Sequence, residues 1–120
     1  MPTVDSQAPV LIVEDDAGVR SFLTDVLEQQ GYRVIASANA EDALELLRTE
    51  PARLAILDVG LPGMDGFAVA DRLAENVPVI LVTGDPVHAY AQARVRNLRY
   101  QVLPKPIAAE LLEHAVAAAL

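Results

Sequence analysis

The stretch LAILDVGLPGMDGF, residues 54–67, decides how this chain folds. It begins with LAIL, an apolar run of the length of a buried strand, and the run ends on a carboxylate, Asp58. The loop after Asp58 is rich in Gly and Pro, residue types that let a chain turn tightly and come close to a bound ion. An ordinary turn would use the same residue types. Whether Asp58 does more than begin a turn depends on what the other strands carry.

Apolar runs of strand length recur along the chain, and helical patterns separate them. The runs that predict strands cover residues 10–13, 33–37, 54–58, 78–83 and 100–104. Helices are predicted over residues 19–27, 43–47, 67–73, 87–97 and 107–116. This alternation predicts an α/β fold, a doubly wound sandwich in which helices cover both faces of a parallel sheet.

The chain length of 120 residues is that of one domain. Half of residues 1–8 are polar and the segment contains proline, so we expect a flexible N-terminal tail there. Residues 9–120 would form the folded domain. With 52% hydrophobic residues, the chain as a whole can bury a core.

The composition restricts location and partners. Nine basic against seventeen acidic residues give a net charge of −8, which repels nucleic acids and anionic membranes. The chain has no Cys, which excludes disulfides and thiolate sites and fits a reducing compartment. Its first apolar run is too short for a signal peptide or a membrane span. We therefore expect a cytoplasmic protein that binds neither nucleic acid nor membranes directly.

Four of the five predicted strands end in polar residues, and the carboxyl ends of parallel strands meet at one edge of a sheet. These residues are the acidic run Glu14-Asp15-Asp16, Asp58, Thr83 and Lys105. Each one alone has a structural explanation, as a helix cap, a turn residue or a solvated surface charge. For Asp16, capping of the following helix is the preferred interpretation. Together, the others indicate a site.

Glu14, Asp15 and Asp58 would form a cluster of carboxylates that needs a positive partner. Two carboxylates about 4 Å apart repel each other by about 4 kcal/mol at an effective dielectric constant of about 20. Oxygen ligands without a nearby His or Cys favour Mg²⁺ as the partner. A carboxylate beside Mg²⁺, with an amine and a hydroxyl facing it, can accept a phosphoryl group.

At this point the sequence resembles a known family, the receiver domain of two-component response regulators. The motifs that carry the resemblance are VEDD (13–16), DVGLPGMDG (58–66), VTG (82–84) and KP (105–106), in this order and spacing. The resemblance spans about residues 9–119 and implies a flavodoxin-like (βα)5 sandwich with strand order 2-1-3-4-5. In that order the strand at 100–104 lies at an edge, where Pro104 is tolerated.

The resemblance also implies a role for each residue. Asp58 would be the phosphoacceptor and would receive the phosphoryl group from a phosphohistidine on a histidine kinase or a histidine phosphotransfer protein. Thr83 would donate a hydrogen bond to a phosphoryl oxygen, and Lys105 would pair with it. The implied Mg²⁺ site consists of Glu14, Asp15, Asp58 and the backbone carbonyl of Gly60.

The sequence departs from the family pattern at one informative position. The family usually has Tyr or Phe three residues before the lysine, whereas this chain has Val102. Tyr100 shares the strand face of Val102 but lies two positions away. We therefore expect the coupling between Thr83 and this strand to be weakened or rerouted. The resemblance further implies a cis peptide bond before Pro106.

The preferred interpretation is a phosphoacceptor switch, not a turnover enzyme, that signals by binding a downstream protein target. The fourth helix, fifth strand and fifth helix offer a face for a homodimer. The domain could stand alone or belong to a hybrid sensor kinase, and the sequence leaves this open.

Two other classes of protein were weighed. A Mg²⁺-dependent phosphatase with an aspartyl nucleophile has a second acid two residues after the first, where this chain has Gly60. A flavin-binding module of the same fold has a Ser/Thr-rich phosphate loop after the first strand, where this chain has three acids that repel phosphate. Both alternatives are less favoured.

Overall fold

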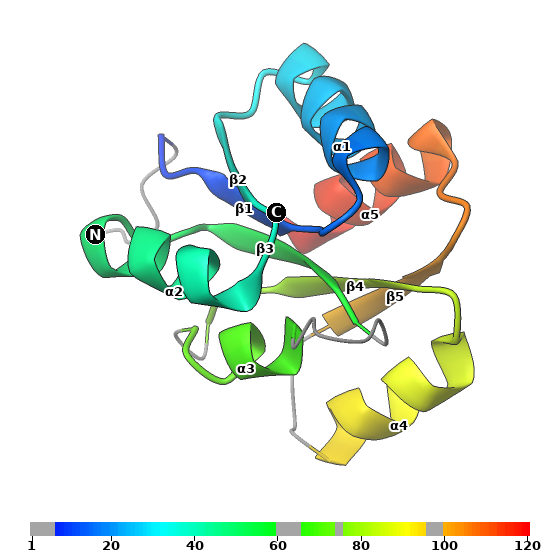
Figure 1. Cartoon of the computed structure of the whole chain (residues 1–120). Coiled ribbons are helices and arrows are strands. Elements are labelled where there is room, and N and C mark those ends of the chain that lie inside the picture. The colour runs from blue at the N-terminus through cyan, green and yellow to red at the C-terminus, as the bar shows by residue number, and fades with distance from the viewer. Residues whose placement is uncertain (1–6, 60–65, 74–75, 96–99) are drawn as a thin grey trace.

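The computed structural model describes residues 7–59, 66–73, 76–95 and 100–120, and within them five strands and five helices alternate (Figure 1). The strands are β1 (Val10–Val13), β2 (Val34–Ser37), β3 (Leu54–Asp58), β4 (Val79–Thr83) and β5 (Tyr100–Pro104). The helices are α1 (Ala17–Gln29), α2 (Ala40–Thr49), α3 (Gly66–Ala70), α4 (Pro86–Val95) and α5 (Ala109–Ala119). Residues 1–6 lie outside the described residues, so the tail over residues 1–8 stays a prediction.

The bounds of three helices differ from the predicted ones or are not fully tested. The fifth helix begins at Ala109 and not at residue 107, and residues 96–97 of the helix predicted over 87–97 lie outside the described residues.

The third helix is shorter than the sequence predicts. The pattern predicts helix as far as Leu73, but α3 ends at Ala70. Beyond that point the amides of Arg72 and Leu73 donate to carbonyls three residues back, those of Val69 and Ala70. Such bonds form a tighter turn than the α-helix has, and the chain leaves the helical path there.

The five strands form one parallel sheet in the order β2-β1-β3-β4-β5, which confirms the predicted topology. β1, β3 and β4 lie in the middle and are buried along their whole length. β5 lies at an edge, where the missing amide of Pro104 interrupts no ladder on the outer side.

Helices cover both faces of the sheet. Figure 1 shows α1 and α5 on one face and α2, α3 and α4 on the other. Strand side chains alternate between the two resulting cores, so Val10 and Ile12 point to the first and Leu11 and Val13 to the second. Burial on both faces holds the central strands rigidly, and their carboxyl ends therefore present residues at fixed positions.

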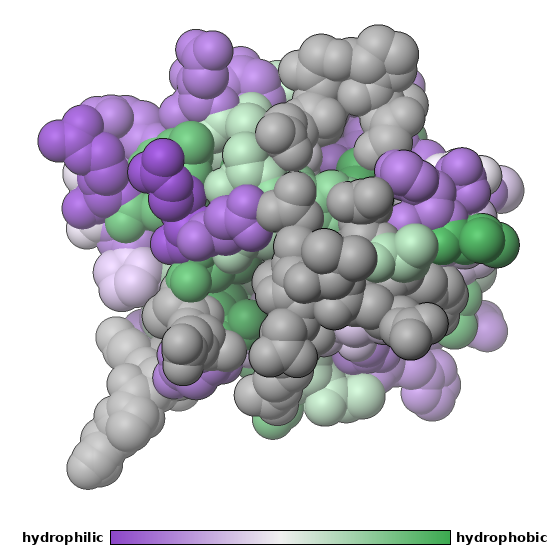
Figure 2. Space-filling view, turned by 90° about the horizontal axis from the view of Figure 1, so that it is seen from below, coloured by the Kyte–Doolittle hydropathy of each residue, from purple (hydrophilic) through white to green (hydrophobic). Residues whose placement is uncertain are grey.

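The surface over α2, α3 and α4 is mixed in character. Figure 2 views the molecule from that side and shows hydrophilic residues around much of the margin, with separate smaller groups of hydrophobic ones among the coloured atoms. Among the helices of the described residues, none combines the length and apolarity that a bilayer span requires.

Local capping sets where the first two helices begin. The amide of Val19 donates to Asp16 Oδ1 at 3.0 Å, which confirms Asp16 as the cap of α1. Asn39 caps α2 in the same way, because the amide of Asp42 donates to its Oδ1 at 2.8 Å. The cap at Asp16 leaves only three residues, 14–16, between β1 and α1, so the acids there stay at the edge of the sheet.

Gly66 allows α3 to pack directly on the end of β3. A Cβ atom added at Gly66 would lie 2.5 Å from the carbonyl oxygen of Asp58 and 2.8 Å from Val59 Cγ1. Real contacts of this kind are longer, so one of the two segments would have to move. The position of Asp58 therefore depends on the lack of a side chain at Gly66.

The substitution Gly66→Ala is expected to lower the free energy of unfolding by about 1–3 kcal/mol, the usual range for overpacking. Gly84→Ala is the matched control, because an added Cβ there meets no atom within 4 Å. Urea unfolding of both variants measures the difference. Equal stability of the two variants would show that the approach of α3 to β3 does not constrain residue 66.

Candidate functional site

The chemistry-bearing residues from four strands meet at the carboxyl edge of the sheet. Asp58 and Thr83 are the last residues of β3 and β4, and Glu14 and Lys105 directly follow β1 and β5. The parallel register places these strand ends level with one another: the aligned pairs are Val13–Leu57, Asp58–Val82 and Thr83–Pro104. Residues up to 91 positions apart in the sequence thus share one site.

Three acids of this edge form a compact cluster. Carboxylate oxygens of Glu14, Asp15 and Asp58 all lie within 4.8 Å of one another. Glu14 and Asp58 have exposed fractions of 0% and 1%, whereas Asp15 is exposed. The buried Asp58 Oδ1 accepts no hydrogen bond from the described residues. An oxygen-only donor set with a buried oxygen free to coordinate fits a hard divalent cation such as Mg²⁺.

Lys105 supplies a positive charge to the two buried acids. Its Nζ lies 3.2 Å from Asp58 Oδ2 and 3.1 Å from Glu14 Oε1. The backbone amide of Lys105 donates to the carbonyl of Thr83 at 2.8 Å, so the pairing of β5 with β4 places the lysine. The peptide bond between Lys105 and Pro106 is cis, as the resemblance implied.

Burial and like charge shift the protonation of these groups. Desolvation, followed by hydrogen bonding and repulsion from Glu14, raises the pKa of Asp58 to about 7, although Lys105 acts in the opposite direction. Burial disfavours the charged form of Lys105, but its contacts with Glu14 and Asp58 outweigh that effect and raise its pKa above 10.5. The ammonium is thus held charged beside acids that repel each other.

Thr83 connects the site to α4. Its hydroxyl is buried and accepts a hydrogen bond from the amide of Asp85 at 2.9 Å. The carboxylate of Asp85 in turn accepts from the amide of His88 at 3.2 Å, in the first turn of α4. Oγ1 of Thr83 keeps its own proton, so it can donate to an acceptor placed at the site.

Two of the predicted features, the carbonyl ligand at Gly60 and the weakened coupling at Val102, are not tested by the structure. Gly60 lies outside the described residues, so the role of its carbonyl stays a prediction. Val102 is half-buried on β5 and packs, like Tyr100, against the core under α2, α3 and α4. Weakened coupling through this strand also stays a prediction.

Two side chains near the site were not identified from the sequence. Phe22 belongs to the apolar stripe that predicts the buried face of α1, yet 37% of it is exposed. Arg20 Nη1 donates to the carbonyls of Glu14 and Asp15, at 2.8 and 3.4 Å. No sequence pattern signals either position, because both depend on what α1 faces in the folded chain.

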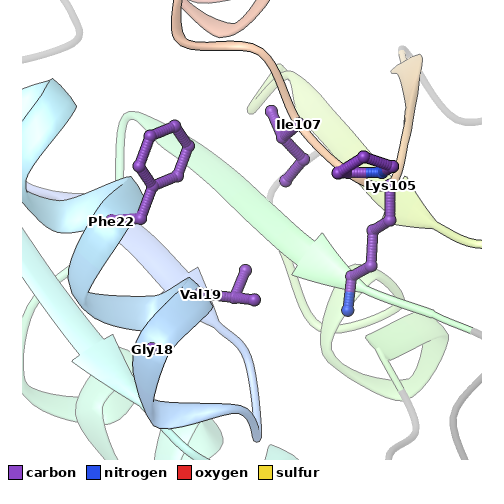
Figure 3. A pocket seen from close by; sticks show the side chains of 6 residues that line it. Gly18, Val19, Phe22, Lys105 and Ile107 are labelled. Atoms are coloured by element: carbon purple, nitrogen blue, oxygen red, sulfur yellow. The ribbon is translucent and has the colours of Figure 1, made fainter.

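The exposed Phe22 lines a shallow apolar groove of about 490 Å³ beside the site. The residues that line it are Gly18, Val19, Phe22, Lys105, Pro106 and Ile107 (Figure 3). Val19 and Phe22 project from α1 on one side, and Ile107 lies on the other. Lys105 lines the groove and also contacts Glu14 and Asp58 of the acidic cluster, so the groove and the cluster are adjacent.

Residues 10–117 match the model of a known family, the response regulator receiver domain. The transcriptional regulatory protein AfsQ1 of Streptomyces coelicolor is 45% identical over 76 residues, which cover 62% of this chain and 34% of the relative. The sporulation initiation phosphotransferase F of Bacillus subtilis is 38% identical over 77 residues, 62% of either chain. The chain therefore spans about a third of the first relative and less than two thirds of the second.

A solved structure shows the same fold over nearly the whole chain. The receiver domain of the hybrid histidine kinase CckA has a TM-score of 0.78 and 29% sequence identity, and the match covers 94% of this chain and 99% of that one.

The substitution Asp58→Asn is expected to stabilise the metal-free protein at high pH. The folded-state pKa of about 7 lies above the ordinary value of 3.8, so folding favours the protonated acid. The stabilisation that the protonated Asp58 carboxyl contributes is greatest below about pH 4 and is lost as the pH rises through about 7. Asn has no acidic proton and gains no buried charge as the pH rises, so its advantage over Asp58 should grow to about 1–2 kcal/mol at about pH 8, where the lost ion pair with Lys105 limits it.

Urea unfolding in EDTA at about pH 5 and about pH 8 measures this advantage. Asp25→Asn, which alters an exposed acid on α1, serves as the control and should show no such pH dependence. If the advantage of Asp58→Asn does not change between the two pH values, the raised pKa of Asp58 is contradicted.

Proposed function

Because the chain belongs to the response regulator receiver domain family, we propose that Asp58 is the residue through which it works as a phosphoacceptor switch. Receiver domains of this family act in two-component and phosphorelay signalling, with histidine kinases, phosphotransfer proteins and effector domains as partners. The roles of the individual residues are our proposal. The observation that carries it is the buried Oδ1 of Asp58, which accepts no hydrogen bond within the described part of the chain and lies near Glu14, Asp15 and the ammonium of Lys105.

Receiver domains generally bind Mg²⁺ at an acidic pocket, and the proposed ligands here follow from the donor set. Glu14, Asp15 and Asp58 would hold the ion, and the carbonyl of Gly60 is included from the resemblance alone. When bound, Mg²⁺ supplies positive charge that offsets the negative charge on the transferred phosphoryl group.

The side chains of the chain itself account for the remaining chemistry. A carboxylate oxygen of Asp58 forms a bond to phosphorus while the bond from phosphorus to the donor histidine nitrogen breaks, and the electron pair of that bond stays on the imidazole. The ammonium of Lys105 would form an ion pair with one phosphoryl oxygen. The hydroxyl of Thr83 would donate a hydrogen bond to another.

Acceptance leaves the phosphoryl group on the protein, so we propose a switch rather than a turnover enzyme. The switch would be read by a downstream protein target. We place it in the cytoplasm, where kinases make phosphohistidine from ATP. A homodimer through α4, β5 and α5 stays a prediction.

Incubation with acetyl phosphate and Mg²⁺ should add one phosphoryl group, which intact-mass spectrometry detects. Asp58→Asn removes the acceptor and EDTA removes the metal, so neither sample should carry the adduct. Asp25→Asn is the matched control and should be modified like the unaltered protein, because Asp25 is exposed on α1, away from the acidic cluster. An unaltered protein that gains no phosphoryl group would refute the proposed function.

The groove beside Lys105 is the surface that we propose contacts the phosphodonor protein. A donor histidine must reach Asp58 at the sheet edge, and this groove adjoins Asp58 through Lys105. Its lining is apolar apart from Lys105, and Phe22 is one of the described large hydrophobic side chains left exposed. A helix of the donor could cover Phe22 while its histidine faces the acidic cluster.

Phe22→Ala should slow phosphoryl transfer from a histidine kinase or phosphotransfer protein by about tenfold, the effect of losing an aromatic contact worth about 1–2 kcal/mol. Transfer from acetyl phosphate, which needs no docking, should not change. Val87→Ala is the control, because Val87 is 80% exposed on α4, which covers the opposite face of the sheet. Equal slowing with both donors would instead indicate damage to the site.

A further inference from the structure

The loop that carries two of the acids is held by hydrogen bonds at several backbone groups. The amide of Glu14 donates to the carbonyl of Ser37 at 3.0 Å, which extends the pairing of β1 with β2 by one residue. The amide of Asp16 donates to Glu14 Oε2 at 3.1 Å, so the loop also fixes the carboxylate of Glu14. The carbonyl of Asp16 accepts from the amide of Arg20 in the first turn of α1.

The side chain of Arg20 holds the two remaining carbonyls of this loop. Its Nη1 donates to the carbonyl of Glu14 at 2.8 Å and lies 3.4 Å from that of Asp15. The guanidinium therefore reaches back from α1 to the residues that directly follow β1. These two residues are the ones whose carboxylates cluster with Asp58.

We propose that Arg20 is a positioning residue for the cation site. It acts through the backbone of Glu14 and Asp15, and holds their carboxylates within reach of Asp58. The inference rests on the proposed function, because it takes Mg²⁺ as the ion that the acids hold. Mg²⁺ demands near-ideal octahedral geometry, so even a small movement of one ligand weakens binding.

The charge and the hydrogen bonds of Arg20 have opposite effects on a cation. A positive guanidinium beside the acids repels Mg²⁺, so loss of the charge alone would tighten binding. Loss of the hydrogen bonds frees the loop and would weaken binding. The direction of the change in Mg²⁺ affinity therefore separates the positioning role from a purely electrostatic one.

Arg20→Gln removes the charge and the Nη1 donor together, because the glutamine side chain is shorter. We expect its Mg²⁺ affinity, measured by calorimetric titration of the unphosphorylated full chain, to fall about tenfold or more. Arg48→Gln is the matched control, because Arg48 is exposed on α2 and pairs with Glu45 at 3.0 Å. It changes the net charge equally and should bind Mg²⁺ almost as the unaltered chain does.

A second readout needs no metal. In EDTA, hydrogen exchange at the amide of Asp16 should be faster in Arg20→Gln than in Arg48→Gln, because the loop loses its anchor. Arg20→Lys keeps the charge, but its side chain is one bond shorter than the path to Nη1, which contacts both carbonyls, so its Mg²⁺ affinity should lie below that of the unaltered chain. Urea unfolding identifies any variant that fails to fold. If Arg20→Gln does not fold, the Mg²⁺ affinity of Arg20→Lys is compared with that of the unaltered chain instead.

The outcomes separate the inference from the proposed function. If the unaltered chain binds Mg²⁺ and Arg20→Gln binds it equally well or more tightly, Arg20 does not position the ligands and the inference is wrong. If the unaltered chain binds no Mg²⁺, the proposed function fails first. Weaker binding in Arg20→Gln, with normal binding in Arg48→Gln, supports the inference.

Discussion

The structure depends on holding two mutually repelling carboxylates, Glu14 and Asp58, out of water at the end of a sheet. Both are almost fully buried, and such a pair is costly without a nearby positive charge. Lys105 supplies that charge, with contacts of 3.1 and 3.2 Å to the two acids. The apolar cores on both faces of the sheet provide the stability that offsets the remaining repulsion. The unfavourable pair persists because the strands that bear it cannot move apart.

The order of the strands explains which side of the site each functional group comes from. β1 and β3 are neighbours in the middle of the sheet and contribute the acids, while β4 and β5 follow on one side and contribute the hydroxyl and the amine. Glu14 and Asp15 therefore come from the β1 side of Asp58, and Thr83 and Lys105 come from the β4 and β5 side, from which the Lys105 ammonium reaches both Asp58 and Glu14. Gly66 contributes by allowing α3 to pack against the backbone that holds this carboxylate.

Two strands of the site, β4 and β5, contact neighbouring parts of the fold in different ways. Thr83 contacts the amide of Asp85, whose carboxylate begins α4, so hydrogen bonds connect the site to that helix. On β5, the branched side chain of Val102 packs in the core and has few rotamers to exchange. Weaker coupling between Thr83 and a side-chain rotation on β5 stays a prediction from the sequence, and the hydrogen bonds through Asp85 are the contacts that the structure shows toward α4.

The sequence by itself determined the strands, the approximate helices, the capping by Asp16 and the polar residues at the strand ends, because periodicity and capping depend on near neighbours. The order of the strands came from resemblance, and the structure confirmed it. Only the tertiary structure decided that Phe22 is exposed, that Arg20 reaches the carbonyls of the acidic loop and that α3 packs on Asp58. It also raised the pKa of Asp58, through burial and repulsion by Glu14. These properties depend on distances between different elements of the fold, which the spacing of residues along a chain does not encode.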